Sequence, residues 1–186
     1  GLGKTIEAGL VIQELLLRQR VELILVACPS SVALQWQGEM LKRFGLHFEV
    51  MSRAFIARRR QERGFGINPW STHQRFIITH SLLRRPEYRD PLLAHLSTLT
   101  AAGTGEGRAR KSLLVLDEAH HGENVDDFDF VGEALQSHGY AVTKLNEAAE
   151  GLAWADISTY DVVWFMNPGH PIDDAATQTA GAAAHP

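Results

Sequence analysis

The chain has 186 residues, of which 45% are hydrophobic and 22% charged, enough for one ordinary core but hardly for two. Its longest apolar run, Leu23 to Cys28, has six residues, whereas a membrane-spanning helix needs roughly 20. The N-terminus carries no signal-peptide pattern, and a single cysteine, Cys28, excludes an internal disulfide. We therefore expect a soluble protein of a reducing compartment, and interpret a chain that starts at Gly1 as a fragment.

Charge is distributed unevenly along the chain, although the net charge is only −4. Residues 1–121 hold 17 basic and 11 acidic side chains, whereas residues 122–186 hold 11 acidic side chains and one base, Lys144. The two parts therefore carry +6 and −10, which predicts that the first part meets a polyanion and the second does not. Two solvated surfaces that differ by descent are the alternative, and charge alone does not separate these readings.

Helical and extended patterns alternate from the start of the chain. Apolar residues at helical spacing predict a helix over Thr5 to Arg18, and the β-branched-rich segment Glu22 to Ala27 predicts a buried parallel strand. Ser30 or Ser31 is expected to cap the next helix, which runs to a break at Gly45.

The later elements continue this alternation. Up to residue 121 we predict a strand His47 to Met51, a basic helix and loop Ser52 to Thr72, a strand Arg75 to Thr79, a helix Asp90 to Leu99 opened by Pro91, and a strand Leu113 to Leu116. Beyond it we predict a helix Asp127 to His138, strands Tyr140 to Leu145 and Asp161 to Met166, and an Ala-rich helix. The pattern predicts an α/β fold, with a parallel sheet flanked by helices in residues 1–121 and a partial second α/β unit in residues 122–186.

The first five residues, GLGKT, match the second half of the phosphate-loop pattern G-x-x-x-x-G-K-[ST]. A helix that starts here would direct its N-terminal amides, including those at Gly1 and Gly3, toward a phosphate. Lys4 would then reach the β- and γ-phosphates of ATP, and the Thr5 hydroxyl would coordinate Mg²⁺. An ordinary glycine turn at a helix start is the alternative.

A second candidate site follows the apolar strand Leu113 to Leu116, which ends in two adjacent carboxylates. Ligands bind at the carboxyl ends of strands in open α/β sheets. There, Asp117 is suited to hold Mg²⁺ through water, and Glu118 to polarise the water that attacks the γ-phosphate. A solvated acidic turn is the alternative, but GKT opening a helix and DEAH closing a strand, in this order, favour a nucleotide site.

Four segments of residues 1–121 together resemble the Swi/Snf-type ATPases of helicase superfamily 2. GLGKTIEAGL resembles motif I, ACPSSVALQWQGEM motif Ia, RFIITHSLLRR motif Ib and LLVLDEAHH motif II. The resemblance implies a RecA-like first lobe that binds ATP and Mg²⁺ and tracks along duplex DNA in a bacterial-type cytoplasm, with a nucleoid association open. It also implies that Ser30 and Thr79 lie near DNA phosphates and that His120 couples the nucleotide to the DNA site.

The chain also departs from that family. No Ser/Thr-Ala-Thr tripeptide follows His121, and neither the adenine-recognising segment nor the second lobe of the parent protein is present. Because the second lobe supplies an arginine to the transferred phosphate, we expect little ATP turnover from this chain alone. The arginines between Arg53 and Arg63, among them Arg58 and Arg59, are candidates for DNA phosphate contacts, with a solvated helix face as the alternative.

Residues 122–186 do not continue the helicase pattern. They look like the early part of a class I glutamine-amidotransferase-like or flavodoxin-like domain, but contain no cysteine for amidotransferase chemistry. Two other readings of the whole chain stay open, namely a noncatalytic α/β nucleotide-binding or interaction domain and an inert mosaic from a gene fusion. Nucleotide binding would separate the ATPase lobe from both.

Overall fold

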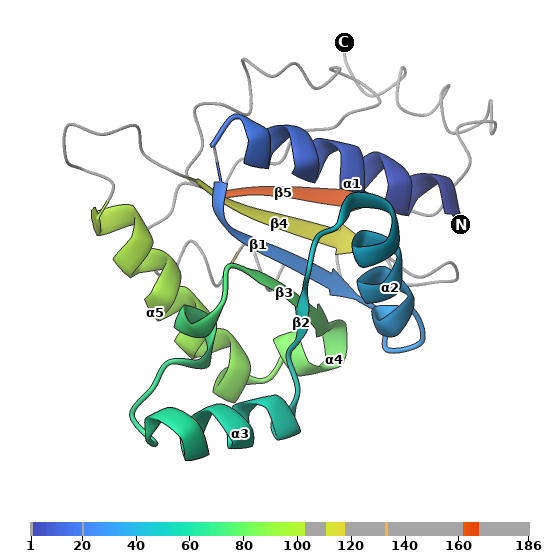
Figure 1. Cartoon of the computed structure of the whole chain (residues 1–186). Coiled ribbons are helices and arrows are strands. Elements are labelled where there is room, and N and C mark those ends of the chain that lie inside the picture. The colour runs from blue at the N-terminus through green and yellow to red at the C-terminus, as the bar shows by residue number, and fades with distance from the viewer. Residues whose placement is uncertain (1, 20, 103–110, 118–132, 134–161, 168–186) are drawn as a thin grey trace, which may run out of the picture. The chain divides into compact units, whose positions relative to one another are not determined.

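A five-stranded parallel sheet with helices packed against it forms the described part of the protein (Figure 1). The computed structural model describes residues 2–19, 21–102, 111–117, 133 and 162–167. Its elements are α1 (Leu2–Leu17), β1 (Val21–Cys28), α2 (Ala33–Phe44), β2 (Glu49–Val50), α3 (Arg53–Arg63), the 3₁₀ helix η1 (Pro69–Thr72), β3 (Arg75–Thr79), α4 (His80–Leu83), α5 (Pro86–Ala102), β4 (Lys111–Asp117) and β5 (Val162–Asn167). The strand order is β2-β3-β1-β4-β5, which confirms the predicted α/β, RecA-like fold class.

Strand β1 lies at the centre of the sheet and explains the longest apolar run in the sequence. It pairs in parallel with β3 on one side and β4 on the other, and its residues 23–28 are all buried. A strand covered on both faces needs apolar side chains at every position rather than at alternate ones. The predicted strands around Glu22 to Ala27 and Arg75 to Thr79 are therefore confirmed.

Helices α1 and α2 share a core with one face of the sheet. Ile12 of α1 and Trp36 and Met40 of α2 are buried together with alternate residues of β1, namely Ile24, Val26 and Cys28. Gly9 of α1 permits this approach, because a Cβ atom there would lie 2.1 Å from a ring atom of Phe44. The two helices thereby pack closely enough to exclude water from the central strand.

The opposite face of the sheet is covered around Trp70. This residue is fully buried in η1, and its ring meets the Phe76 ring of β3 edge-on at a centroid distance of 5.1 Å. Its Nε1–H donates to the Tyr88 carbonyl of α5 at 2.9 Å. Through these two contacts, Trp70 connects η1 to the sheet and to α5.

Three predicted helix starts are wrong. Helix α1 begins at Leu2 instead of Thr5; the first four amides of a helix have no intrahelical partner, so the first turn leaves no fixed residue pattern from which its start could be predicted. Helix α2 has Val32 as its N-cap with no side-chain hydrogen bond, since Ser30 and Ser31 lie in the preceding turn. Helix α5 begins at Pro86, a residue pre-organised for the first helical position, so that Pro91 lies inside it.

The predicted end of α2 is confirmed at Gly45. Its φ of 65° lies in the left-handed region, which glycine adopts without steric cost. Its N–H donates to the Leu41 carbonyl at 3.0 Å, and the N–H of Leu46 donates to the Met40 carbonyl at 3.1 Å. The last carbonyls of the helix are therefore satisfied before the chain turns toward β2.

Strand β5 confirms the strand predicted at Asp161 to Met166. It pairs in parallel with β4, from Ser112 against Val162 to Asp117 against Asn167, and so belongs to the same compact unit as residues 1–118. The predicted boundary at residue 121, the helix Asp127 to His138, the strand Tyr140 to Leu145 and the Ala-rich helix fall outside the described residues, apart from Glu133. The division at residue 121 stays a prediction.

Candidate functional site at the carboxyl edge of the sheet

Strands β3, β1, β4 and β5 lie side by side in the sheet, and the residues at their carboxyl ends are neighbours. Cys28 ends β1 and pairs in register with Thr79, which ends β3. Asp117 ends β4 and pairs with Asn167, which ends β5. Because all these strands are parallel, their ends form one edge, the place where open α/β sheets bind ligands.

The N-terminus of α1 lies at the same edge (Figure 1). The helix has 16 residues and β1 has eight, so each is about 25 Å long, and the short connection between them makes them antiparallel. The amides at the start of α1 therefore lie near the ends of the strands, as a phosphate site requires. Thr5 is buried in this first part of the helix.

Asp117 is held by a hydrogen bond from a distant part of the chain. Trp36 of α2 is 3% exposed, and its Nε1–H donates to Asp117 Oδ2 at 2.5 Å. Among the described residues, this is the hydrogen bond that the Asp117 carboxylate accepts. Sequence reasoning missed this contact, although the need of a buried indole N–H for an acceptor was a usable signal.

Cys28 is a second residue of the edge that sequence reasoning did not connect with the site. Its side chain is fully buried, and the pKa of its thiol rises from the ordinary value of 9.0 to about 12. Burial is the main cause, and the negative charge of Asp117 adds to it. The thiol is therefore a neutral packing group at neutral pH and not a nucleophile.

The raised pKa of Cys28 predicts a loss of stability in alkali. Between pH 9 and 12 the unfolded chain releases the thiol proton and the folded chain keeps it, so the unfolding free energy should fall as pH rises, with a limiting slope of about 1.4 kcal/mol per pH unit from this group. Urea unfolding of the unmodified chain and Cys28→Ala at pH 8, 9 and 10.5 measures this slope. Identical slopes in the two proteins would contradict the assignment.

The two predicted DNA-contacting hydroxyl residues lie at this same edge. Ser30 is exposed in the turn that follows β1, and Thr79 is half-buried at the end of β3. The Thr79 hydroxyl lies 3.2 Å from the Ser81 hydroxyl. The fold thus brings these two residues, 49 positions apart, to adjacent strand ends.

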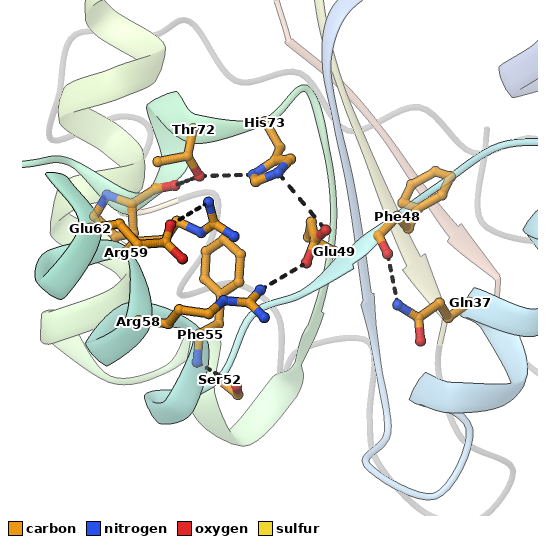
Figure 2. Close-up of polar contacts among 11 residues, drawn as sticks. Gln37, Phe48, Glu49, Ser52, Phe55, Arg58, Arg59, Glu62, Thr72 and His73 are labelled. Carbon is orange, nitrogen blue, oxygen red and sulfur yellow. Dashed lines mark hydrogen bonds and ion pairs between the residues drawn. The ribbon is translucent and has the colours of Figure 1, made fainter.

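The predicted arginine cluster of α3 separates into two groups, and Figure 2 shows the first of them, Arg58 and Arg59. Arg58 lies 3.8 Å from Glu49, Arg59 lies 2.8 Å from Glu62, and both guanidinium groups stand over the Phe55 ring. We call these two the paired arginines. The unpaired arginines, Arg53, Arg60 and Arg63, are exposed and form no ion pair with any other described residue.

His73 links the paired arginines to the sheet. Its Nδ1 lies 2.9 Å from the Thr72 hydroxyl, and its Nε2 lies 3.8 Å from Glu49, the residue that also meets Arg58 (Figure 2). The pKa of His73 is lowered, first by burial and then by the neighbouring arginines, against the opposing effect of Glu49. Through Glu49, Arg58 of α3 and His73 after η1 both contact β2, whereas the pair of Arg59 with Glu62 lies within α3.

Several predicted site residues cannot be placed from this structure. Gly1, Glu118 and His120 lie outside the described residues, and of Gly3 and Lys4 only the helical backbone is described. Within the described ranges no three His, Cys, Asp or Glu side chains gather as metal ligands, and no helix there is long and apolar enough to cross a membrane. The roles assigned to these residues stay predictions.

Comparisons with known proteins match part of the chain, and the relatives named below are the same protein in different bacteria. No protein-family model matches the chain. The RNA polymerase-associated protein RapA of Sodalis glossinidius, that of Yersinia enterocolitica and that of Cronobacter sakazakii are each 38% identical to the chain over 121 residues. The matched residues are 65% of this chain and 11% of each relative. Over about two thirds of its length, the chain is therefore similar to one short stretch of the RNA polymerase-associated protein RapA.

Proposed function

We propose that the described unit is the nucleotide-binding lobe of a Swi/Snf-type ATPase of helicase superfamily 2. The observation that carries the proposal is the common edge at which α1 begins and β4 ends in Asp117. The order of the four sequence motifs and the similarity to RapA support it. A noncatalytic α/β interaction domain is the competing reading, and nucleotide binding separates the two.

The residues of this edge fit a magnesium nucleotide. Mg²⁺ is usually held by one or two carboxylates together with water and substrate phosphates, rather than by a complete protein cage. Asp117 supplies such a carboxylate, and we propose that the Thr5 hydroxyl joins it. When bound, the ion would neutralise charge on the β- and γ-phosphates of ATP.

The other proposed roles follow from the chemistry of each side chain. The amides at Gly1 and Gly3 and the ammonium group of Lys4 would bind the phosphates, and Glu118 would orient the attacking water. His120 would couple this site to DNA. These roles rest on the sequence pattern and on the resemblance.

Calorimetric titration with Mg²⁺ and ADP tests the proposal. Lys4→Ala removes a charge-assisted phosphate contact, which is commonly worth about 1.5–3 kcal/mol, and should weaken binding at least about tenfold. Lys42→Ala, which removes an exposed lysine from the last turn of α2, is the matched control and should bind as the unmodified chain does. Equal affinities for all three proteins would refute the phosphate-loop assignment.

We propose duplex DNA as the partner of residues 1–121, in the bacterial cytoplasm. Three features support a contact with a polyanion: the net charge of +6 in residues 1–121, the unpaired arginines, and the exposed turn at Ser30. The relatives are described as RNA polymerase-associated, and an association of the parent protein with that machinery is part of the proposal.

A further inference from the structure

We propose that Trp36 is the positioning residue of the metal-holding carboxylate, fixing Asp117 Oδ2 so that the other oxygen is presented to a divalent cation. The inference rests on the proposed function, in which Asp117 helps to hold the nucleotide's metal ion. It goes further by giving a tryptophan of α2, 81 residues away in the sequence, a defined role at that site.

The geometry requires Asp117 to act as an acceptor toward Trp36. An indole Nε1–H only donates, so the Asp117 oxygen that it meets at 2.5 Å is the acceptor. A hydrogen bond to an ionised carboxylate is stronger than one between neutral groups. The contact therefore fixes which carboxylate oxygen of Asp117 faces α2 and how the carboxylate is oriented at the strand end.

The surroundings of Trp36 make it a rigid support. Its ring is 3% exposed and lies in the same core cluster as Met40 and Ile77, so packing fixes its rotamer. Asp117 itself is half-buried at the strand end. One side of the carboxylate is thus anchored in the core and the carboxylate as a whole is kept from rotating.

Positioning is important because Mg²⁺ and Mn²⁺ bind carboxylates with strict geometry. Removing a hydrogen-bond partner that orients a metal ligand typically weakens metal affinity about 10- to 100-fold. Among the described residues, the Trp36 indole is the side-chain donor to the Asp117 carboxylate. Loss of the Trp36 N–H should therefore lower the affinity of the site for the metal ion.

The chain offers a matched control in Trp70. It is also fully buried and also donates its Nε1–H to an oxygen, the Tyr88 carbonyl, at 2.9 Å. Trp36→Phe and Trp70→Phe each keep an aromatic ring and each remove one buried indole donor. A general loss of packing would affect both variants, whereas a positioning role concerns Trp36 alone.

The test measures Mn²⁺ binding to the full chain in the presence of ADP, by electron paramagnetic resonance of the free ion. Trp36→Phe should bind Mn²⁺ about 10- to 100-fold more weakly than the unmodified chain, and Trp70→Phe should bind it equally well. The affinity for ADP without metal should be the same in all three proteins. Equal Mn²⁺ affinity for Trp36→Phe and the unmodified chain would overturn the inference and leave the proposed function intact.

A second measurement keeps the inference testable if Trp36→Phe folds poorly. In ¹H–¹⁵N spectra of the full chain, Asp117→Asn should shift the Trp36 indole resonance and leave the Trp70 indole resonance unchanged. An unmoved Trp36 resonance would refute the contact. If the unmodified chain binds neither ADP nor Mn²⁺ with ADP, the proposed function itself fails, and this inference fails with it.

Discussion

Duplex DNA should bind the chain roughly a hundredfold more weakly at about 200 mM salt than at about 50 mM, if about four phosphates are neutralised. Each neutralised phosphate contributes about 0.9 to the slope of log affinity against log salt, which gives a slope near −3.6. The +6 balance of residues 1–121 supplies the attraction, and the −10 of residues 122–186 opposes it without contributing contacts. Fluorescence anisotropy of a labelled duplex at several salt concentrations measures the slope.

The two arginine groups of α3 allow a sharper version of this experiment. Arg60→Gln/Arg63→Gln removes two unpaired arginines and should reduce the slope by about 1.8. Arg58→Gln/Arg59→Gln removes the same formal charge from the paired arginines and should change the slope much less, because these side chains already meet Glu49 and Glu62. A flat salt dependence, or equal slopes for the two variants, would show that the arginines of α3 form a solvated helix face and do not contact DNA phosphates.

Trp70→Ala should destabilise the unit by about 3–5 kcal/mol, as truncation of a fully buried tryptophan typically does. The substitution removes the contact with the Phe76 ring and leaves the Tyr88 carbonyl without its indole donor. Urea unfolding followed by far-ultraviolet circular dichroism gives the shift in midpoint. Phe65→Ala is the control, because this ring is 86% exposed and its loss should change stability by less than about 0.5 kcal/mol. If Trp70→Ala lowered the free energy of unfolding by no more than about 0.5 kcal/mol, Trp70 would not be the residue that joins η1 to α5 and the sheet.

The strands could be predicted from the sequence because they are buried, and a strand buried on both faces consists of apolar residues. Leu23 to Cys28 is apolar at every position since helices cover both faces of β1. Gly45 was predictable as a helix end for an equally local reason, its left-handed backbone. The starts of α1 and α2 were not, because no side chain is required at the first turn of a helix.

The candidate site was predictable only in part. Motif spacing and the strand pattern place Asp117 at a strand end, and the structure confirms that placement in β4. The partner of Asp117 could not be predicted, since Trp36 lies 81 residues away and reads in the sequence as one more apolar position of a helix. Arg58 likewise meets Glu49, nine residues earlier on another element, a contact that depends on how α3 packs against β2.

The shortness of β2 has a consequence for how copies of this unit behave at high concentration. It is the last strand in the order on its side of the sheet and contains only Glu49 and Val50. Long, flat, apolar edge strands are templates for intermolecular pairing and aggregation. Here an incoming strand would find two residues, one of them a carboxylate that already meets Arg58 and His73. This side of the sheet is therefore a poor template for strand pairing with a second copy.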